Sequence, residues 1–276
     1  MYIGNFAGRE SSLGYCPNAE FIAKTFVECG YKVKGMNEAE VEAKGILKEL
    51  KKRDYQFILT EEARLKGDFQ NAGERDIIKG TFKEVMVKSK KPIVAWLTNI
   101  FWGIMRREEH IYKNPIFKAD IVFSTDGGHQ QEFEKAGVNH FLLRQGIYQE
   151  EAYLGKPIYP TKAEIGFVGS LYQHIWPYRK ELIKFLYKTY GNRFEHFGQR
   201  GEVRHDDLNN LCATLKIVVG DSVYSPYYWS NRVYEVIGRG GFLIHHLVEG
   251  LDQEFIPYKH FVPYQFNNFQ NLKRVI

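Results

Sequence analysis

Short apolar runs alternate with amphipathic, charged stretches along the chain, a pattern typical of parallel β-sheets joined by crossover helices. In the first half the charged stretches predict helices over 18–29 and 38–52, and Gly30 stands where a C-cap glycine belongs. The apolar runs predict six strands, over residues 2–6, 31–34, 55–60, 92–97, 120–124 and 139–143. This half alone predicts a complete doubly wound unit.

The alternation lapses around residues 149–162, where Gly155, Pro157 and Pro160 give the composition of a linker. It then resumes with strands predicted over 164–168, 194–197, 216–219, 242–245 and 260–264, and helices over 177–190, 206–215, 231–237 and 251–255. We therefore expect an α/β protein with two Rossmann-like domains, residues 1–155 and 156–276, facing across a cleft. Open parallel sheets bind ligands beyond the carboxyl ends of their strands, so we expect the ligand in that cleft.

Composition narrows the possible ligands and compartments. The 276 residues carry a formal charge of +5, which suits an anionic small molecule and is too small to require nucleic acid. Three cysteines, Cys16, Cys29 and Cys212, form no CxxC pair, so we expect neither disulfides nor a zinc site. No apolar stretch is long enough to span a membrane and no signal peptide is evident, which predicts a cytoplasmic protein.

The stretch from Ser230 to Ile244 carries the most chemical information. A polar cap, Ser230 and Asn231, starts a short helix that ends at glycines and leads into an apolar strand. Unpaired amides at such a cap can face an anion. Glu235 on this helix can accept hydrogen bonds from both hydroxyls of a ribose, and Arg232 can meet a phosphate or hold Glu235 in place. The alternative is an ordinary acidic residue that complements the helix dipole.

A second informative stretch follows the strand predicted over 164–168. The backbone of the Gly169-Ser170 turn can approach a diphosphate closely, and Arg179 or Lys180 can neutralise it. A Gly-Ser turn is weak evidence when taken alone, and the sequence has no dinucleotide fingerprint, Walker loop or G-x-S-x-G elbow.

The order of these segments resembles the CgeB-like (spore-maturation) glycosyltransferase group of the GT-B fold. The resemblance covers roughly residues 120–275 and rests on Phe167-Val168-Gly169-Ser170, Arg179, His196-Phe197-Gly198, Lys216 to Val219, and Arg232 to Glu235 followed by Gly240 to Ile244. It implies transfer of a sugar from a nucleotide-diphosphate sugar, without a metal or other cofactor. The first domain would then bind the acceptor and the second the donor.

The resemblance also implies roles for individual residues. Glu235 would hold the ribose, Gly169, Ser170 and Arg179 would contact phosphates, and Phe197 and Gly198 would lie against the base. Tyr227 stands where retaining members of the wider fold often carry a second glutamate, so the stereochemical outcome stays open. The chain also stops soon after Lys273, before the C-terminal helix that such relatives usually add.

An inverting enzyme needs a base in the first domain to take the proton of the acceptor. The candidates are Glu10 in the first glycine loop and, after the strand over 120–124, Asp126 and His129. For Asp126 taken alone, a turn and a helix N-cap are the favoured explanation. The adjacent pair His245-His246 cannot easily chelate one ion, because neighbours on a strand point to opposite faces. We expect one of the pair to be packed and the other to face the cleft.

Three functions are consistent with these features. The first is a glycosyltransferase acting on a small molecule, glycan or protein. The second is a DNA-modifying glycosyltransferase that acts on hydroxylated bases, which the mild positive charge permits. The third is a non-catalytic module that binds a nucleotide sugar.

Overall fold

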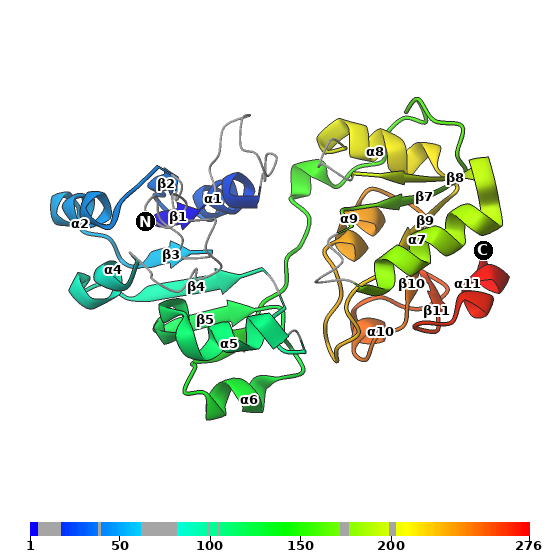
Figure 1. Cartoon of the computed structure of the whole chain (residues 1–276). Coiled ribbons are helices and arrows are strands. Elements are labelled where there is room, and N and C mark those ends of the chain that lie inside the picture. The colour runs from blue at the N-terminus through cyan, green and yellow to red at the C-terminus, as the bar shows by residue number, and fades with distance from the viewer. Residues whose placement is uncertain are drawn as a thin grey trace. The chain divides into compact units, whose positions relative to one another are not determined.

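The computed structural model describes residues 1–4, 18–37, 40–61, 82–98, 100–103, 105–171, 177–198 and 203–276. Contacts between residues divide the chain into two compact units, Met1–Arg144 and Gln145–Ile276, each with its own parallel sheet (Figure 1). The boundary predicted between residues 155 and 156 lies a little later along the chain. The α/β class and the doubly wound arrangement of each half are confirmed.

The sheet of the first unit is entirely parallel and, within the described ranges, has six strands in the order β2-β1-β3-β4-β5-β6. The strands are β1 (Tyr2–Gly4), β2 (Gly35–Asn37), β3 (Ile58–Thr60), β4 (Ile93–Leu97), β5 (Ile121–Ser124) and β6 (His140–Leu142). Apart from β2, each lies inside a predicted strand.

Strand β2 begins later than the predicted run 31–34. Helix α1 (Asn18–Glu28) ends at Gly30, whose φ is +87°, and the amide of Tyr31 donates to the carbonyl of Phe26. These are the bonds of a glycine C-cap, and they keep residue 31 attached to the helix end. The chain joins the sheet only at Gly35, which is in register with Tyr2 of β1.

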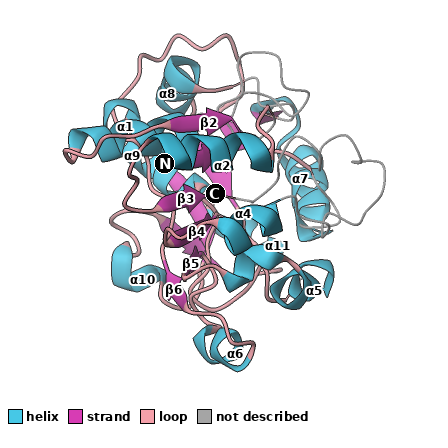
Figure 2. Cartoon of the chain, turned by 90° about the vertical axis from the view of Figure 1, so that its left-hand side faces the viewer, coloured by secondary structure: helices cyan, strands magenta, loops and turns pink. Residues whose placement is uncertain are grey.

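Helices cover both faces of the first sheet (Figure 2). Helix α1 packs through Ala19 against Tyr2 and Leu59 on one face. Opposite it lies the larger core, to which the other helices contribute buried residues such as Ile46, Val85, Ile111 and Phe133. Those helices are α2 (Ala43–Lys52), α4 (Phe82–Lys88), α5 (Met105–Lys113) and α6 (Gln130–Lys135), with a 3-10 turn at Pro115–Lys118.

In the second unit, five parallel strands of the described chain follow the order β11-β10-β9-β7-β8. They are β7 (Ile165–Val168), β8 (Phe194–Phe197), β9 (Ile217–Gly220), β10 (Leu243–His246) and β11 (Val262–Tyr264). The helices are α7 (Pro177–Tyr190), α8 (His205–Thr214), α9 (Arg232–Gly238), α10 (Leu251–Glu254) and α11 (Phe269–Val275). The bounds of α7 and β8 coincide with the prediction.

Residues that are adjacent on a strand enter different cores of the second unit, as the pleat requires. Val218 packs with α8, α9 and α10, whereas Val219 packs with α7 and α11. Leu243 and Ile244 of β10 divide in the same way. Because both faces of the sheet are covered, its strands are continuous apolar runs, which is why their positions are readable in the sequence.

The segment that composition marks as a linker is packed against α8. Its carbonyls at Glu151 and Tyr153 accept from the amide nitrogen of Asn209, at 3.1 and 3.0 Å. A methyl group added at Gly155 would meet the backbone of Asn209 at 2.2 Å, so a glycine is needed there for close approach.

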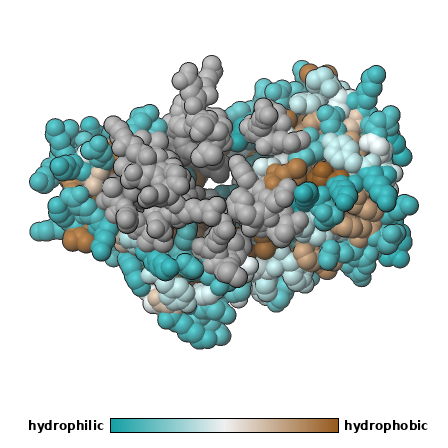
Figure 3. All heavy atoms as spheres, in the orientation of Figure 1, coloured by the Kyte–Doolittle hydropathy of each residue, from teal (hydrophilic) through white to brown (hydrophobic). Residues whose placement is uncertain are grey.

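The surface facing the viewer in Figure 3 is mainly hydrophilic on each unit, with smaller hydrophobic areas. None of the helices in the described part of the chain is long and apolar enough to cross a membrane.

Candidate functional site

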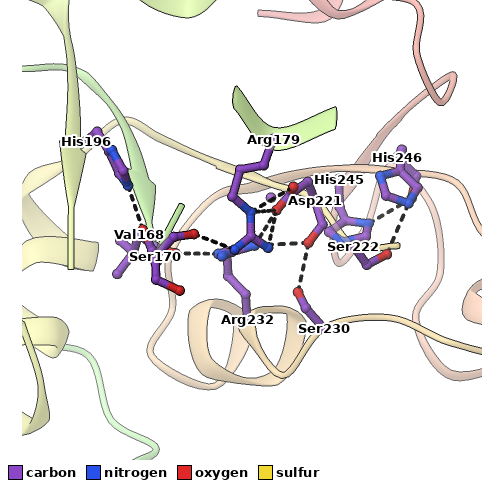
Figure 4. Close-up of polar contacts among 12 residues, drawn as sticks. Val168, Ser170, Arg179, His196, Asp221, Ser222, Ser230, Arg232, His245 and His246 are labelled. Atoms are coloured by element: carbon purple, nitrogen blue, oxygen red, sulfur yellow. Dashed lines mark hydrogen bonds and ion pairs between the residues drawn. The ribbon is translucent and has the colours of Figure 1, made fainter. Parts of the chain in front are cut away.

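A buried ion cluster lies at the carboxyl ends of β7 and β9 (Figure 4). Asp221, directly after β9, is 1% exposed and receives the guanidinium groups of Arg179 from α7 and Arg232 from α9. Nε of Arg179 lies 3.0 and 2.9 Å from the two carboxylate oxygens, and Nη1 of Arg232 lies 3.0 Å from Oδ1. Both guanidinium groups also lie over the ring of Phe167, at 5.3 and 4.3 Å.

The cluster carries a net positive charge, because two guanidinium groups face one carboxylate. Burial alone would raise the pKa of Asp221, but attraction to Arg179 and Arg232 outweighs it, so that pKa lies below its ordinary value. Burial and the neighbouring charge of Arg179 lower the pKa of Arg232 to about 10, which leaves it charged at neutral pH. An anion near this cluster would therefore be stabilised.

The two arginines also hold the turn that follows β7. Nη1 of Arg179 donates to the carbonyl of Ser170 at 2.6 Å, and Nε of Arg232 donates to the carbonyl of Val168 at 2.6 Å. From β8, Nε2 of His196 lies 2.5 Å from the carbonyl oxygen of Gly169. With its carbonyls bonded to these side chains, the turn is held in one conformation.

Gly169 is required by this arrangement. Its φ is +143°, and an added Cβ would lie 2.4 Å from Nη2 of Arg232. We expect Gly169→Ala to lower the free energy of unfolding by more than about 1 kcal/mol, because the side chain meets both backbone strain and a buried guanidinium. Urea unfolding of the full chain measures the loss.

Gly191→Ala is the matched control for that substitution. Gly191 has a φ of +55° but nothing lies within 4 Å of an added Cβ, so only the backbone strain remains. A loss at Gly169 no larger than the loss at Gly191 would contradict the contact with Arg232.

Glu235 lies on the first turn of α9 and is held by a second arginine, not by Arg232. Its Oε1 accepts from Nδ2 of Asn231 at 3.0 Å, and its Oε2 pairs with Arg239 one turn later. Arg239 also pairs with Glu151 at 2.8 Å and donates to Oδ1 of Asn209 at 2.5 Å. The side chain of Glu235 is 29% exposed, so that solvent reaches part of it.

Burial raises the pKa of Glu235 above its ordinary value, and Arg239 partly offsets that rise. We expect Arg239→Met to raise this pKa further, because it removes the nearest positive charge and a hydrogen bond to the ionised form. A carboxyl-carbon NMR titration measures the shift, with Arg193→Met, which removes a surface partner of Glu164, as the control. An unchanged Glu235 titration in the Arg239 variant would contradict the assignment.

The other predicted donor residues occupy different surroundings. Phe197 is buried in the core against Tyr159, so its ring presents no free face to a base. Gly198 has a φ of +73° and brings its backbone close to that of Gly169. Oγ of Ser230 donates to the carbonyl of Asp221 at 3.0 Å. Arg179 is buried beneath the turn at Ser170 and donates to the carbonyl of that residue.

Among the predicted bases, Asp126 is fully buried. Its carboxylate accepts from the amide of Phe101 at 2.9 and 3.0 Å and from that of Trp102 at 3.1 Å. This side chain holds the loop after residue 100 and has no exposed surface. The turn-forming alternative therefore describes Asp126 better than a catalytic role.

His129 follows the same strand and occupies the N-cap position of α6, where its half-buried side chain makes no capping hydrogen bond. Its ring stacks on Trp102, with centroids 5.9 Å apart. Glu10 lies outside the described residues, as does Cys16.

Both histidines at the end of β10 are buried, so the expectation that one faces a cleft is wrong. Nδ1 of His245 lies 2.7 Å from the carbonyl of His246, and Nε2 of His246 lies 3.1 Å from Oγ of Ser222. The centroids of the two rings lie 4.5 Å apart. Burial lowers the pKa of His245 to about 4 and that of His246 well below its ordinary value.

Within the described ranges, no group of three or more His, Cys, Asp or Glu side chains could hold a metal ion.

Two central residues of this site, Asp221 and Arg239, are missing from the sequence-based prediction. Asp221 directly follows an apolar strand, at the edge where ligands of parallel sheets bind, and this position is a usable signal. Arg239 stands four residues after Glu235, the spacing of a helical ion pair.

Comparison with known proteins agrees with this geometry. A family model described as glycosyl transferase-like matches residues 177–275, within the second unit. No curated protein matches the sequence.

Solved structures of glycosyltransferases are similar over most of the chain, at identities that show the fold alone. A glycosyltransferase from Rickettsia africae is 11% identical, with a TM-score of 0.60 over 99% of this chain and 86% of that one. HepE from Anabaena, solved with UDP-glucose, is 11% identical, with a TM-score of 0.60 over 99% of this chain and 88% of that one. A sucrose-phosphate synthase from Thermosynechococcus elongatus is 14% identical, with a TM-score of 0.53 over 84% of this chain and 66% of that one. The chain has the GT-B fold, with two Rossmann-like domains.

Proposed function

We propose that this protein is a glycosyltransferase that moves a sugar from a nucleotide-diphosphate sugar to an acceptor. The family match and the solved neighbours support this general activity of a nucleotide-sugar glycosyltransferase. The observation that carries the proposal is the pairing of two features at one sheet edge. Glu235, whose side chain is partly exposed, lies on α9, and the buried cationic cluster of Arg179, Asp221 and Arg232 supports the turn after β7.

Each feature suits one part of the donor. The ionised carboxylate of Glu235 accepts hydrogen bonds only, so it matches the two hydroxyls of a ribose. The turn at Gly169 and Ser170 offers backbone that a diphosphate can approach, and the charge of the two arginines behind it stabilises that anion. We therefore propose that donor binding relies on these cations and needs no metal.

The donor nucleotide is proposed to be a uridine diphosphate, because HepE was solved with UDP-glucose. In the transfer, the bond between the sugar and the β-phosphate oxygen breaks and a bond to an acceptor oxygen forms. The nucleoside diphosphate leaves, and the proton of the acceptor passes to a base.

For that base we propose His129. It is the candidate with a partly exposed side chain at the end of a strand, whereas Asp126 is buried and bonded to backbone amides. A His129→Gln variant that binds donor normally and transfers sugar at the wild-type rate would remove it from this role.

Thermal-shift measurements test the proposal with uridine, guanosine, adenosine and thymidine diphosphates and their sugars. A bound nucleotide at ~100 times its dissociation constant is expected to add about 2.7 kcal/mol of stability. We expect the uridine compounds to give the largest shift. No shift with any of the four families would reject the proposal, and a shift without turnover of the sugar would favour a non-catalytic binding module.

A further inference from the structure

A second hollow in the same unit lies away from the ion cluster, at the carboxyl ends of β9, β10 and β11. It has a volume of about 690 Å³, in the range of small-molecule sites. Tyr224 and Tyr227 line it from the segment after β9, Glu249 from the segment after β10, and Phe266 from the segment after β11. The segments that follow three neighbouring strands thus contribute side chains to one hollow.

The lining combines aromatic rings with hydrogen-bonding groups. Tyr224 is 58% exposed, and its ring lies 4.9 Å from that of Phe266 at a tilt of 31°. Phe266 is in turn fixed against Tyr178, at 4.7 Å. A ring that is supported on one side and open on the other offers a flat apolar surface to a ligand.

The polar groups of this groove define the chemistry of its occupant. The side chains of Glu249, Asp252 and Gln253 have no hydrogen-bond partner in the described part of the chain. Two of them are carboxylates, which only accept hydrogen bonds when ionised, so they suit an occupant that brings hydrogen-bond donors. None of the described lining residues is a lysine or arginine, which disfavours a nucleotide or a nucleic acid.

Tyr227 has an unusual backbone conformation, which also indicates a ligand-binding site. Its φ is +54°, an uncommon value for a residue with a side chain, and its amide donates to the carbonyl of Glu249 at 3.0 Å. Gly250 makes room for the ring, since an added Cβ there would meet Cδ1 of Tyr227 at 2.3 Å. Residues held in such conformations concentrate at ligand-binding sites.

From these features we propose that the groove binds a neutral saccharide. The C–H faces of the sugar would lie on Tyr224, and its hydroxyls would donate to Glu249 and Asp252. The groove would hold a part of a glycan acceptor remote from the hydroxyl whose proton passes to His129 of the first unit. That role rests on the proposed glycosyltransferase function, whereas saccharide binding itself does not. The acceptor would then be a glycan, not DNA.

Direct binding to the full chain tests this inference without any nucleotide. The probes are an array of neutral glycans and, in solution, cellohexaose, laminarihexaose and maltohexaose, with spermidine as a cationic competitor. We expect at least one neutral glycan to bind and Tyr224→Ala to weaken that binding by about tenfold, the loss expected for one stacked aromatic ring. Tyr224→Phe keeps the ring and should bind nearly as well as the wild type.

The control is Tyr112→Ala, which removes an exposed tyrosine from α5 and should leave binding unchanged. Asp252→Asn is a second variant that keeps the size of an exposed side chain and should weaken binding even if Tyr224→Ala fails to fold. Failure of every neutral glycan to bind, or displacement of the glycan by spermidine, would overturn the inference. A thermal shift with a nucleotide but no glycan binding would reject saccharide binding in the groove and leave the proposed donor site standing. Glycan binding without any thermal shift from a nucleotide would reject the proposed donor site and leave the groove standing.

Discussion

Replacing Asp221 with alanine is expected to lower the free energy of unfolding by about 3–5 kcal/mol, the loss typical of a broken buried ion pair. The carboxylate is 1% exposed and is the partner of both Arg179 and Arg232. Without it, two buried guanidinium groups would face each other with no compensating charge. Urea unfolding of the wild type and the variant, followed by circular dichroism, measures the difference.

Glu164→Ala provides a matched control in the same unit. Glu164 also pairs with two cations, Arg193 and Lys216, but both are largely exposed. Water screens such pairs, so this substitution should have a much smaller effect. Similar losses for the two variants would show that the Asp221 cluster is not energetically distinct from a surface network.

The pH dependence of stability offers a second view of the same cluster. Because the pKa of Asp221 is lowered in the folded state, its contribution is present above the unfolded-state value, about 3.9, and is lost as pH falls through the folded value. The wild type should therefore lose stability below about pH 4 more steeply than Asp221→Ala. Parallel acid profiles would contradict the lowered pKa.

Glu235→Ala is expected to weaken binding of the nucleoside diphosphate by about 1–3 kcal/mol, through loss of charged hydrogen bonds to the ribose. That range corresponds to roughly 5- to 150-fold in the dissociation constant. The fold should survive, because Arg239 keeps its contacts with Glu151 and Asn209. Calorimetric titration gives the affinity, and Glu181→Ala on the exposed side of α7 is the control.

The raised pKa of Glu235 adds a pH signature to this prediction. Hydroxyls donate to the ionised carboxylate, so nucleotide affinity should fall as the pH drops through that pKa. Since burial raises the pKa, the fall should begin at a higher pH than for an ordinary glutamate. The Glu235→Ala variant should lack this dependence, and the same pH profile in both proteins would remove Glu235 from the ribose site.

The strands of both sheets were predictable because helices cover both faces of each. Val218 and Val219 enter different cores, so the whole of β9 is apolar and stands out from the polar sequence around it. Strand β2 was placed too early because the glycine cap at Gly30 holds the next residues near the helix end, and no local pattern reveals where the chain joins the sheet.

The site was predictable in outline but not in its pairings. Glu235 and the turn at Gly169 were identified from their places at the ends of strands and helices. The pairing of Arg179 with Asp221 was not, because the two residues lie 42 positions apart in sequence and only the folded sheet brings them together. Asp126 was a candidate base because it follows a strand, but its burial depends on the distant loop at Phe101.

Binding of a nucleoside diphosphate to the full chain tests the central claim most directly. Calorimetric titration with the diphosphates of uridine, guanosine, adenosine and thymidine should show saturable binding of at least one, with clearly weaker binding by Glu235→Ala. If none of the four binds the wild-type protein, or if Glu235→Ala binds as tightly as the wild type, the second unit does not hold its donor in the way this site predicts.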